Sequence, residues 1–278
     1  MKPDFIFIGA SKCATSTISN LIGQHPDVFM ISQETWFFSH DEIYQKGRDW
    51  YESLYENAGN SKVRGERNNV YSMKEVFPKT VARLAEYNPN LKLIYCVRHP
   101  IERIESYWLE IRSHGGEDVH YDFNTAVKAN RERLVDASNY WSQINAFRRH
   151  FPDDQILILF LEDFKHDADA VMRNCFEFIG VDPDSPLTNS NLHLNPSHSK
   201  LIPSNTLSRL RAYPLFRNSV KLIPEQLRNT LKHKLFFKQA DGRPQWAPAA
   251  YEWALDILGE DTRKFLNHYG KSQDFWQI

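Results

Sequence analysis

The chain of 278 residues is poor in cysteine: it has only Cys13, Cys96 and Cys175, which lie far apart. Three is an odd and small number for a disulfide framework, and none of them is near enough to another for a zinc site. We therefore expect reduced thiols. No group of histidines, cysteines and carboxylates has metal-ligand spacing, so we expect a protein that uses no metal.

Long apolar runs and an excess of one charge are absent as well. No segment approaches the roughly 20 apolar residues of a membrane-spanning helix, and the first thirty residues lack the pattern of a signal peptide. We expect a cytoplasmic protein with no membrane span. The 34 basic and 35 acidic residues give a formal charge of −1, which argues against a nucleic-acid partner. Any anion site is then a local feature.

The sequence does contain an alternation of apolar, strand-like runs and helical periodicity. The predicted strands are residues 4–9, 91–97 and 155–160, with shorter extended pieces at 36–38 and 62–66. The predicted helices are residues 15–24, 101–114, 167–179 and 248–268. This alternation predicts an α/β fold with a mostly parallel sheet flanked by helices, as in P-loop-like proteins. The length and the 41% hydrophobic content favour a single domain over residues 1–278.

The region after the third strand and its helix has a different composition. Residues 180–205 gather prolines, serines and asparagines, which is typical of a long surface loop. Between residues 200 and 243 there are ten Lys or Arg and two acids, Glu225 and Asp241. This basic excess fits either a solvated helical face or a surface that binds anions.

The first polar constellation lies where the first predicted strand meets the first predicted helix. Gly9 is followed by Lys12 and by three hydroxyl residues, Thr15, Ser16 and Thr17. The first turn of a helix offers unpaired N–H groups and the positive end of the dipole, which suits phosphate. This is not a Walker A loop, because no serine or threonine directly follows the lysine. Taken alone, a hydroxyl here is equally well a simple helix cap.

A second constellation follows the second predicted strand. Arg98 comes at the carboxyl end of that strand, where open α/β sheets bind ligands, and Ser106 lies eight residues later on the next helix. A guanidinium pairs with two phosphate oxygens at once, so these two residues are suited to gripping one phosphate. For Arg103 we expect an ordinary surface ion pair with Glu102 or Glu105.

These two constellations resemble the nucleotide-binding motifs of sulfotransferases that use 3′-phosphoadenosine 5′-phosphosulfate (PAPS). Residues 9–17 are similar to the family's 5′-phosphosulfate loop, P-K-S/T-G-T-T/S, and residues 98–106 look like its 3′-phosphate segment, R-x-P-x-x-R-x-x-S. Four stretches between them resemble the heparan sulfate and glycan sulfotransferase branch: residues 25–28, 34–38, 47–51 and 65–71. The resemblance covers nearly the whole chain. It is weakest over about 182–247, where the choice of acceptor is expected to reside.

The first motif departs from the family pattern at two positions. Cys13 stands where the family has serine or threonine, and Ala14 stands where it has glycine. Alanine accepts helical dihedral angles and resists a positive φ, so we expect the loop to form with Ala14 at the helix entrance. A methyl group beside the phosphosulfate can weaken the binding of the donor.

The resemblance implies transfer of the sulfuryl group from PAPS to a hydroxyl or amine of a small-molecule or glycan acceptor, by in-line displacement and without metal. A saccharide is the favoured acceptor. The resemblance assigns Lys12 to the leaving phosphate, Glu34 to the general base and Arg67 to the sulfuryl group, in place of the family's lysine. Without the resemblance, Glu34 would be an ordinary surface carboxylate. The rival base is a histidine, His40 or His114.

The resemblance also implies contacts to PAPS and to its product, 3′-phosphoadenosine 5′-phosphate (PAP). They are Lys12, Cys13, Ala14, Thr15, Ser16, Thr17, Arg98, Ser106, Tyr140 and Lys200. Lys200 lies in a stretch where the family often closes a loop over the 3′-phosphate. Tyr140 is explained equally well as a buried helix residue, and Glu66 either orients Arg67 or lines the acceptor cleft.

Two other functions fit parts of this pattern. A P-loop nucleotide kinase would share the fold, but it would need a Walker A loop and a magnesium ligand, which Glu162 and Asp163 offer only ambiguously. A catalytically silent protein of the same fold could instead bind anionic glycans through its basic region. The sulfotransferase hypothesis depends on one geometric expectation: Lys12 and the pair of Arg98 and Ser106 converge across neighbouring strand ends.

Overall fold

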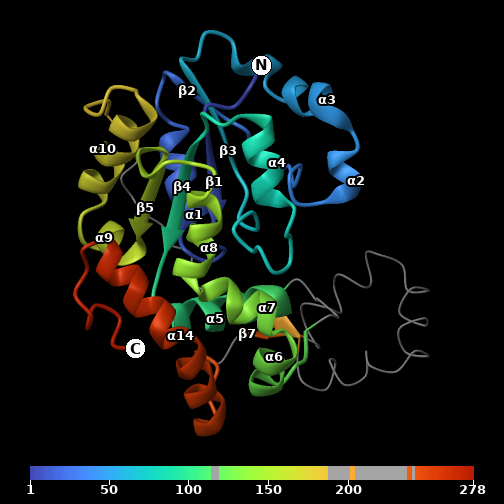
Figure 1. The fold of residues 1–278 in the computed structure, drawn as a ribbon, viewed down its shortest axis with the longest axis vertical. Coiled ribbons are helices and arrows are strands. Elements are labelled where there is room, and N and C mark those ends of the chain that lie inside the picture. The colour runs from blue at the N-terminus through green and yellow to red at the C-terminus, as the bar shows by residue number, and fades with distance from the viewer. Residues whose placement is uncertain (114–118, 187–200, 204–236, 240–241) are drawn as a thin grey trace.

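The computed structural model describes residues 1–278 except 114–118, 187–200, 204–236 and 240–241. Its centre is a five-stranded parallel sheet in the order β2-β3-β1-β4-β5 (Figure 1). The strands are β1 (Phe5–Gly9), β2 (Val28–Met30), β3 (Val63–Arg67), β4 (Lys92–Val97) and β5 (Ile156–Phe160). The predicted α/β fold with a parallel sheet is confirmed.

Helices connect the strands and surround the sheet (Figure 1). They are α1 (Thr15–Ile22), α2 (Asp41–Tyr44), α3 (Gly47–Ser53), α4 (Thr80–Tyr87), α5 (Pro100–Ser113), α6 (Phe123–Ala129), α7 (Arg131–Leu134), α8 (Tyr140–Arg148), α9 (Leu161–His166), α10 (Ala168–Ile179) and α14 (Pro248–His268). Two short strands, β6 (Leu201–Pro203) and β7 (Phe237–Gln239), form a separate antiparallel pair. None of the helices in the described ranges is long and apolar enough to cross a bilayer.

The central strands are apolar because both faces of the sheet are covered. All five residues of β1 and five of the six residues of β4 are buried, as a parallel sheet between two helical layers requires. Successive side chains of a strand point to opposite faces. On β4, Tyr95 packs against Tyr140 of α8 with ring centroids 5.9 Å apart, while Cys96 lies near Cys175 of α10. Helices α8 and α10 therefore lie on opposite faces.

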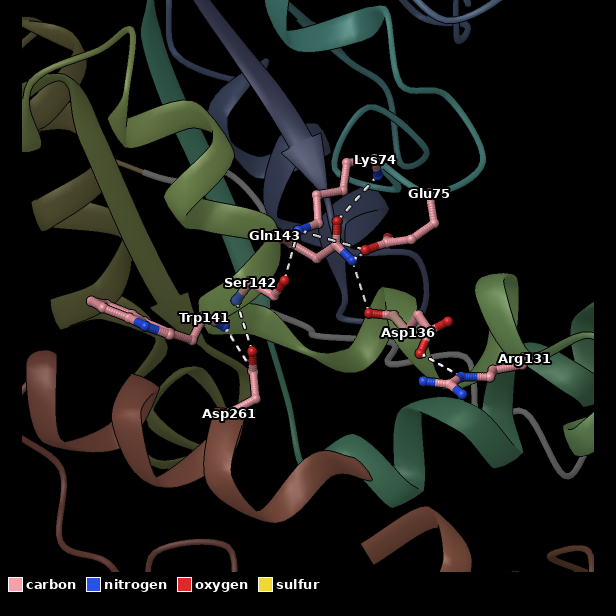
Figure 2. A network of polar contacts seen from close by, with 8 residues as sticks. All are labelled: Lys74, Glu75, Arg131, Asp136, Trp141, Ser142, Gln143 and Asp261. Atoms are coloured by element: carbon pink, nitrogen blue, oxygen red, sulfur yellow. Dashed lines mark hydrogen bonds and ion pairs between the residues drawn. The ribbon is translucent and has the colours of Figure 1, made fainter. Parts of the chain in front are cut away.

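A polar network holds the beginning of α8 (Figure 2). Asp261 of α14 accepts the backbone N–H groups of Trp141 and Ser142 at 2.9 and 2.7 Å, in the manner of a helix cap. Burial raises the pKa of Asp261 to about 6. The amide of Gln143 donates to Glu75, which follows β3, at 2.6 Å. Because α14 and the segment after β3 both hold α8, its first residue, Tyr140, has a fixed place against β4.

A second, smaller core holds α5 in place. Ile104, Trp108 and Leu109 of α5 pack with Phe123 of α6 and Leu258 of α14. Polar residues of α5, among them Glu102, Ser106 and Glu110, face the cavity at the carboxyl ends of the strands. The second core therefore decides which residues of α5 can reach a ligand.

The predicted helices and longer strands end within about two residues of the observed ones, and the last helix coincides with α14. The prediction of an extended piece at 36–38 is wrong. The backbone turns at Trp36, whose φ is +54°, and this turn brings both Phe37 and Phe38 into the core against Tyr51. Most of the predicted loop at 180–205 and of the basic region lies outside the described residues.

Candidate active site

The carboxyl ends of the parallel strands open into one cavity of about 680 Å³. Nine residues that the sequence singled out line it: Lys12, Ala14, Thr15, Ser16, Thr17, Glu34, Arg67, Arg98 and Ser106. Strand β1, which precedes the first motif, pairs directly with β4, which precedes the second. The expected convergence of the two motifs across neighbouring strand ends is therefore confirmed.

The loop between β1 and α1 is tightly turned. Lys12 and Ala14 have positive φ angles of +73° and +58°, and Ala14 is the left-handed N-cap residue of α1. Ala14 lies at the helix entrance, as expected, but it adopts the positive φ that an alanine resists, because the turn into α1 has a left-handed residue at this position. That conformation costs an alanine about 1–2 kcal/mol, so the surrounding contacts must hold the loop.

The first turn of α1 faces the cavity. The first intrahelical hydrogen bond runs from the Ile18 N–H to the Ala14 carbonyl at 3.0 Å. The N–H groups of Thr15, Ser16 and Thr17 therefore precede the helical ladder. The first turn has no acidic residue, so no carboxylate on α1 compensates the positive end of its dipole. This end of the cavity is suited to an anion.

Two residues expected to contact the donor, Cys13 and Tyr140, lie beneath the cavity. Both are at most 1% exposed. Burial raises the pKa of the Cys13 thiol to about 11, so it is neutral. The Tyr140 hydroxyl donates to the carbonyl of Arg98 at 2.9 Å and lies 3.9 Å from the Cys13 sulfur. Their side chains support the two motifs from the core side.

Arg98 joins the two motifs. It donates through Nη1 to the carbonyl of Lys12 at 3.3 Å and through Nη2 to Glu102. Its buried Nε has no partner among the described residues. Glu102 also pairs with Arg243 at 2.9 Å. Burial disfavours the charged form of Glu102, but the hydrogen bonds and charges of these two arginines outweigh it and lower its pKa. Ser106 lines the same wall.

Glu34 is the centre of a hydrogen-bond network on the other wall. Its Oε1 accepts from Arg67 Nη1 at 2.9 Å and from Asn69 Nδ2 at 2.7 Å, and its Oε2 accepts the indole N–H of Trp36 at 3.0 Å. Trp36 is 45% exposed and has a left-handed backbone, which is unusual for a large side chain. A fixed carboxylate and an exposed indole therefore lie side by side in the cavity.

Lys12 pairs with a carboxylate of α5. Its Nζ lies 2.7 Å from Glu110 Oε2, and the two side chains are only 19% and 26% exposed. In the described lining of the cavity, five cationic side chains stand against four carboxylates. Cations are thus held near the anion-binding end of α1, with carboxylates as their counter-ions.

Glu66 has a different place from the two that the sequence allowed. It is fully buried, does not line the cavity, and accepts the hydroxyl of Thr35 at 2.7 Å. Burial raises its pKa to about 7. Since Thr35 follows Glu34 in the chain, Glu66 fixes the segment that carries the candidate base.

The expectation of a surface ion pair for Arg103 is wrong. Its side chain is fully buried, and Nη1 donates to the carbonyl of Leu134 at 3.2 Å and to Ser138 Oγ at 2.8 Å. Arg103 faces away from the cavity because α5 packs its other side against α7 and the second core. The residue therefore anchors α5.

His40 and His114 are the histidines that the sequence offered as rival general bases. His40 does not line the cavity; its ring packs between Trp36 and Phe77, with centroids 5.7 and 5.0 Å apart. His114 and Lys200 lie outside the described residues.

Sequence reasoning assigned no role to several polar residues of the cavity wall, among them Asn69, Glu110 and Lys165. Asn69 could have been found, because it lies two residues after the end of β3. Glu110 lies four residues after Ser106, and this spacing places both on one helical face. Arg243 belongs to the basic stretch between residues 200 and 243, but no local signal places it at the cavity, which it reaches from a distant part of the chain.

The fold and the cavity define an α/β protein whose strand ends open into a cavity with a lining suited to an anion. Residues 2–234 match the family model described as "Sulfotransferase domain". The chain therefore belongs to the sulfotransferase domain family.

Curated relatives lie in the heparan sulfate branch, which confirms the resemblance. Heparan sulfate glucosamine 3-O-sulfotransferase 5 of Mus musculus is 27% identical over 166 residues, 56% of this chain and 47% of that protein. Bifunctional heparan sulfate N-deacetylase/N-sulfotransferase 1 of Caenorhabditis elegans is 24% identical over 251 residues, 82% of this chain and 28% of that protein. The chain spans about half the length of these relatives, or less.

Solved structures agree on the fold. A sulfotransferase from Alicyclobacillus acidocaldarius superimposes with a TM-score of 0.69 at 18% identity, over 100% of both chains. A mouse sulfotransferase complexed with PAP superimposes with a TM-score of 0.52 at 16% identity, over 95% of this chain and 85% of that one.

Proposed function

We propose that this protein transfers the sulfuryl group of PAPS to a hydroxyl or amine of a saccharide. The observation that carries the proposal is the shared cavity: the Lys12 loop, the pair of Arg98 and Ser106, and Glu34 all line it. Membership of the sulfotransferase family supports PAPS as the donor.

The donor lies across the ends of β1 and β4 in this proposal. Its 5′-phosphosulfate rests on the first turn of α1 beside Lys12, where N–H groups and a cation meet. Its 3′-phosphate lies at Arg98 and Ser106, with Arg243 near the same end. A guanidinium can bind two oxygens of that phosphate, and Arg98 lines the cavity.

The chemistry is an in-line displacement at sulfur. The acceptor oxygen or nitrogen forms the new bond to sulfur, and the bond from sulfur to the 5′-phosphate oxygen breaks. The electron pair stays on that phosphate, which leaves as PAP and is stabilised by Lys12 and the N-terminus of α1. The acceptor proton passes to Glu34. Arg67 stabilises the negative charge on the sulfuryl oxygens in the transition state.

Trp36 supports a sugar as the acceptor. An exposed indole beside the candidate base offers an apolar surface with a polar edge, and a sugar ring has both kinds of surface. The two relatives described above carry heparan sulfate in their names, which points in the same direction.

Donor binding and transfer test the proposal together. PAP at 100 times its Kd should stabilise the protein by about 2.7 kcal/mol, and ATP with magnesium should not. Radiolabelled PAPS should then label heparan sulfate oligosaccharides, tested in separate pools with free amines and with N-sulfated glucosamines. Stabilisation by ATP with magnesium but not by PAP would contradict the proposal.

The Glu34→Gln variant tests the base. Loss of the proton acceptor should lower kcat by about 10²–10⁴-fold while the Kd of PAP changes less than about twofold. Glu132→Gln, an exposed carboxylate on α7, is the matched control. An unaltered kcat in the Glu34 variant would move the base to a histidine.

A further inference from the structure

Asn69 has contacts that the proposed function leaves unexplained. Its side chain lies between the donor loop and the segment that carries Glu34. Its Oδ1 accepts the hydroxyl of Thr15 at 2.6 Å, and its Nδ2 donates to Glu34 Oε1 at 2.7 Å. One side chain therefore joins the first turn of α1 to the candidate base.

The backbone of Asn69 is tied to the same loop. The hydroxyl of Ser11 donates to the Asn69 carbonyl at 3.0 Å. Gly9 allows this close approach, since a Cβ there would lie 3.3 Å from that carbonyl and 2.4 Å from Ser72 Oγ. Its φ of +141° also favours glycine. The segment after β3 is thus held against the donor loop.

An amide is the group that satisfies both partners of Asn69. The Thr15 hydroxyl needs an acceptor and the Glu34 carboxylate needs a donor, and an amide has one of each. These partners also define which way the amide points. A leucine of similar shape would serve neither partner, and an aspartate would set a second carboxylate against Glu34.

The contacts also distinguish the two oxygens of Glu34. Oε1 accepts from both Asn69 and Arg67, whereas Oε2 accepts the Trp36 indole N–H. Each carboxylate oxygen has about two lone-pair sites, so Oε1 is filled. In the part of the chain that the structure describes, Oε2 is the oxygen with a site left to take a proton.

We propose that Asn69 is a positioning residue that fixes Glu34 against the donor loop and directs its Oε2 at the acceptor. The inference rests on the proposed function, because Asn69 acts through the base. A displacement of about 1 Å at a reacting group can cost about 100-fold in rate. The amide makes no ion pair with the donor, so donor affinity should change little.

The experiment compares Asn69→Leu and Asn69→Asp with the wild type. Sulfuryl transfer to heparan sulfate oligosaccharides is measured, together with the hydrolysis of PAPS, in which water replaces the saccharide and gives up its proton to the same base. In Asn69→Leu both rates should fall about 10–100-fold while the Kd of PAP changes less than about threefold. Asn90→Ala, an exposed residue before β4, is the control.

The relative loss of activity in the two variants distinguishes a positioning role of Asn69 from a merely structural one. Aspartate keeps the acceptor for Thr15 and nearly the shape of asparagine, so a structural role makes it the milder change. Positioning of Glu34 makes aspartate at least as harmful to the rates as leucine, in variants that both remain folded.

Wild-type rates in Asn69→Leu would overturn the inference about Asn69 but not the proposed function. A smaller loss of rate in Asn69→Asp than in Asn69→Leu would do the same. A wild-type protein that fails to bind PAP would overturn the proposed function instead. One that binds PAP but turns over neither the oligosaccharides nor water would contradict both.

Discussion

The two walls of the cavity handle their polar groups differently. On the first wall, formed by the ends of β1, β2 and β3, Thr15, Asn69 and Glu34 bond one another in sequence, and Glu34 also pairs with Arg67. On the second wall, formed by α5, carboxylates hold cations: Glu102 bonds Arg98, and Glu110 bonds Lys12. The first wall keeps its geometry through hydrogen bonds of its own, and the second holds charges that a bound anion can take over.

This difference suggests a division of labour. A preorganised network suits the group that must act in the transition state, because no reorganisation is then needed at the moment of reaction. Cations with carboxylate counter-ions suit the donor, because phosphate can replace carboxylate as the partner. The variants below test this division, from the largest expected effect to the smallest.

Lys12→Ala should have the largest effect, because Lys12 follows β1 on the first wall and its side chain pairs with Glu110 of the second wall. Loss of its charge beside the leaving phosphate should lower transfer by about 10³-fold. The measurement is transfer from radiolabelled PAPS. Lys62→Ala, at an exposed lysine paired with Asp27, is the control. Normal transfer in Lys12→Ala would remove this residue from the mechanism.

Arg98→Ala should have the next largest effect, and it should be selective. Loss of a charged hydrogen-bond partner of the 3′-phosphate is worth about 1.5–3 kcal/mol, or roughly 10–100-fold in the Kd of PAP. Adenosine 5′-phosphosulfate, which lacks the 3′-phosphate, should bind almost as before, and calorimetric titration checks both. Arg48→Ala, at an exposed arginine, is the control. Equal losses for both nucleotides would mean that Arg98 acts by holding the Lys12 carbonyl.

Glu110→Gln should strengthen donor binding. The neutral side chain no longer competes with the donor for Lys12, so the Kd of PAP should fall by about 3–10-fold, which corresponds to roughly 0.7–1.4 kcal/mol. Titration with PAP at constant salt is the measurement, since exposed charges are screened by salt. The control is again Glu132→Gln. Unchanged or weaker binding of PAP would show that the donor phosphate does not replace the carboxylates of the second wall as the partner of their cations.

Ala14→Gly should have the smallest effect and should stabilise the protein. Relief of the left-handed strain is worth about 1–2 kcal/mol, partly offset by the greater freedom of glycine in the unfolded chain. The melting temperature should rise by about 2–4 °C. Ala82→Gly, at an exposed position of α4, should lower it instead. A lower melting temperature in Ala14→Gly would mean that the loop does not store strain at this position.

The sequence predicted the parts of the site that are continuous in the chain. Lys12 and Thr15 belong to one turn, and Arg98 follows a strand whose apolar run is easily seen. The burial of Arg103 was not predictable in the same way, because its neighbours Glu102 and Glu105 made an ion pair equally plausible. The direction in which its helical face points depends on α7, which packs against α5 only in the folded chain.

By itself, the sequence determined the central strands, the long helices and the residue types of the two motifs, because hydrophobic period and turn residues act over short distances. The tertiary structure alone decided which polar groups meet. Thr15 and Asn69 are 54 residues apart and Lys12 and Glu110 are 98 apart, and they come together because β3, β1 and β4 lie side by side in the sheet. Such pairings depend on the order of the strands, which local physical chemistry does not specify.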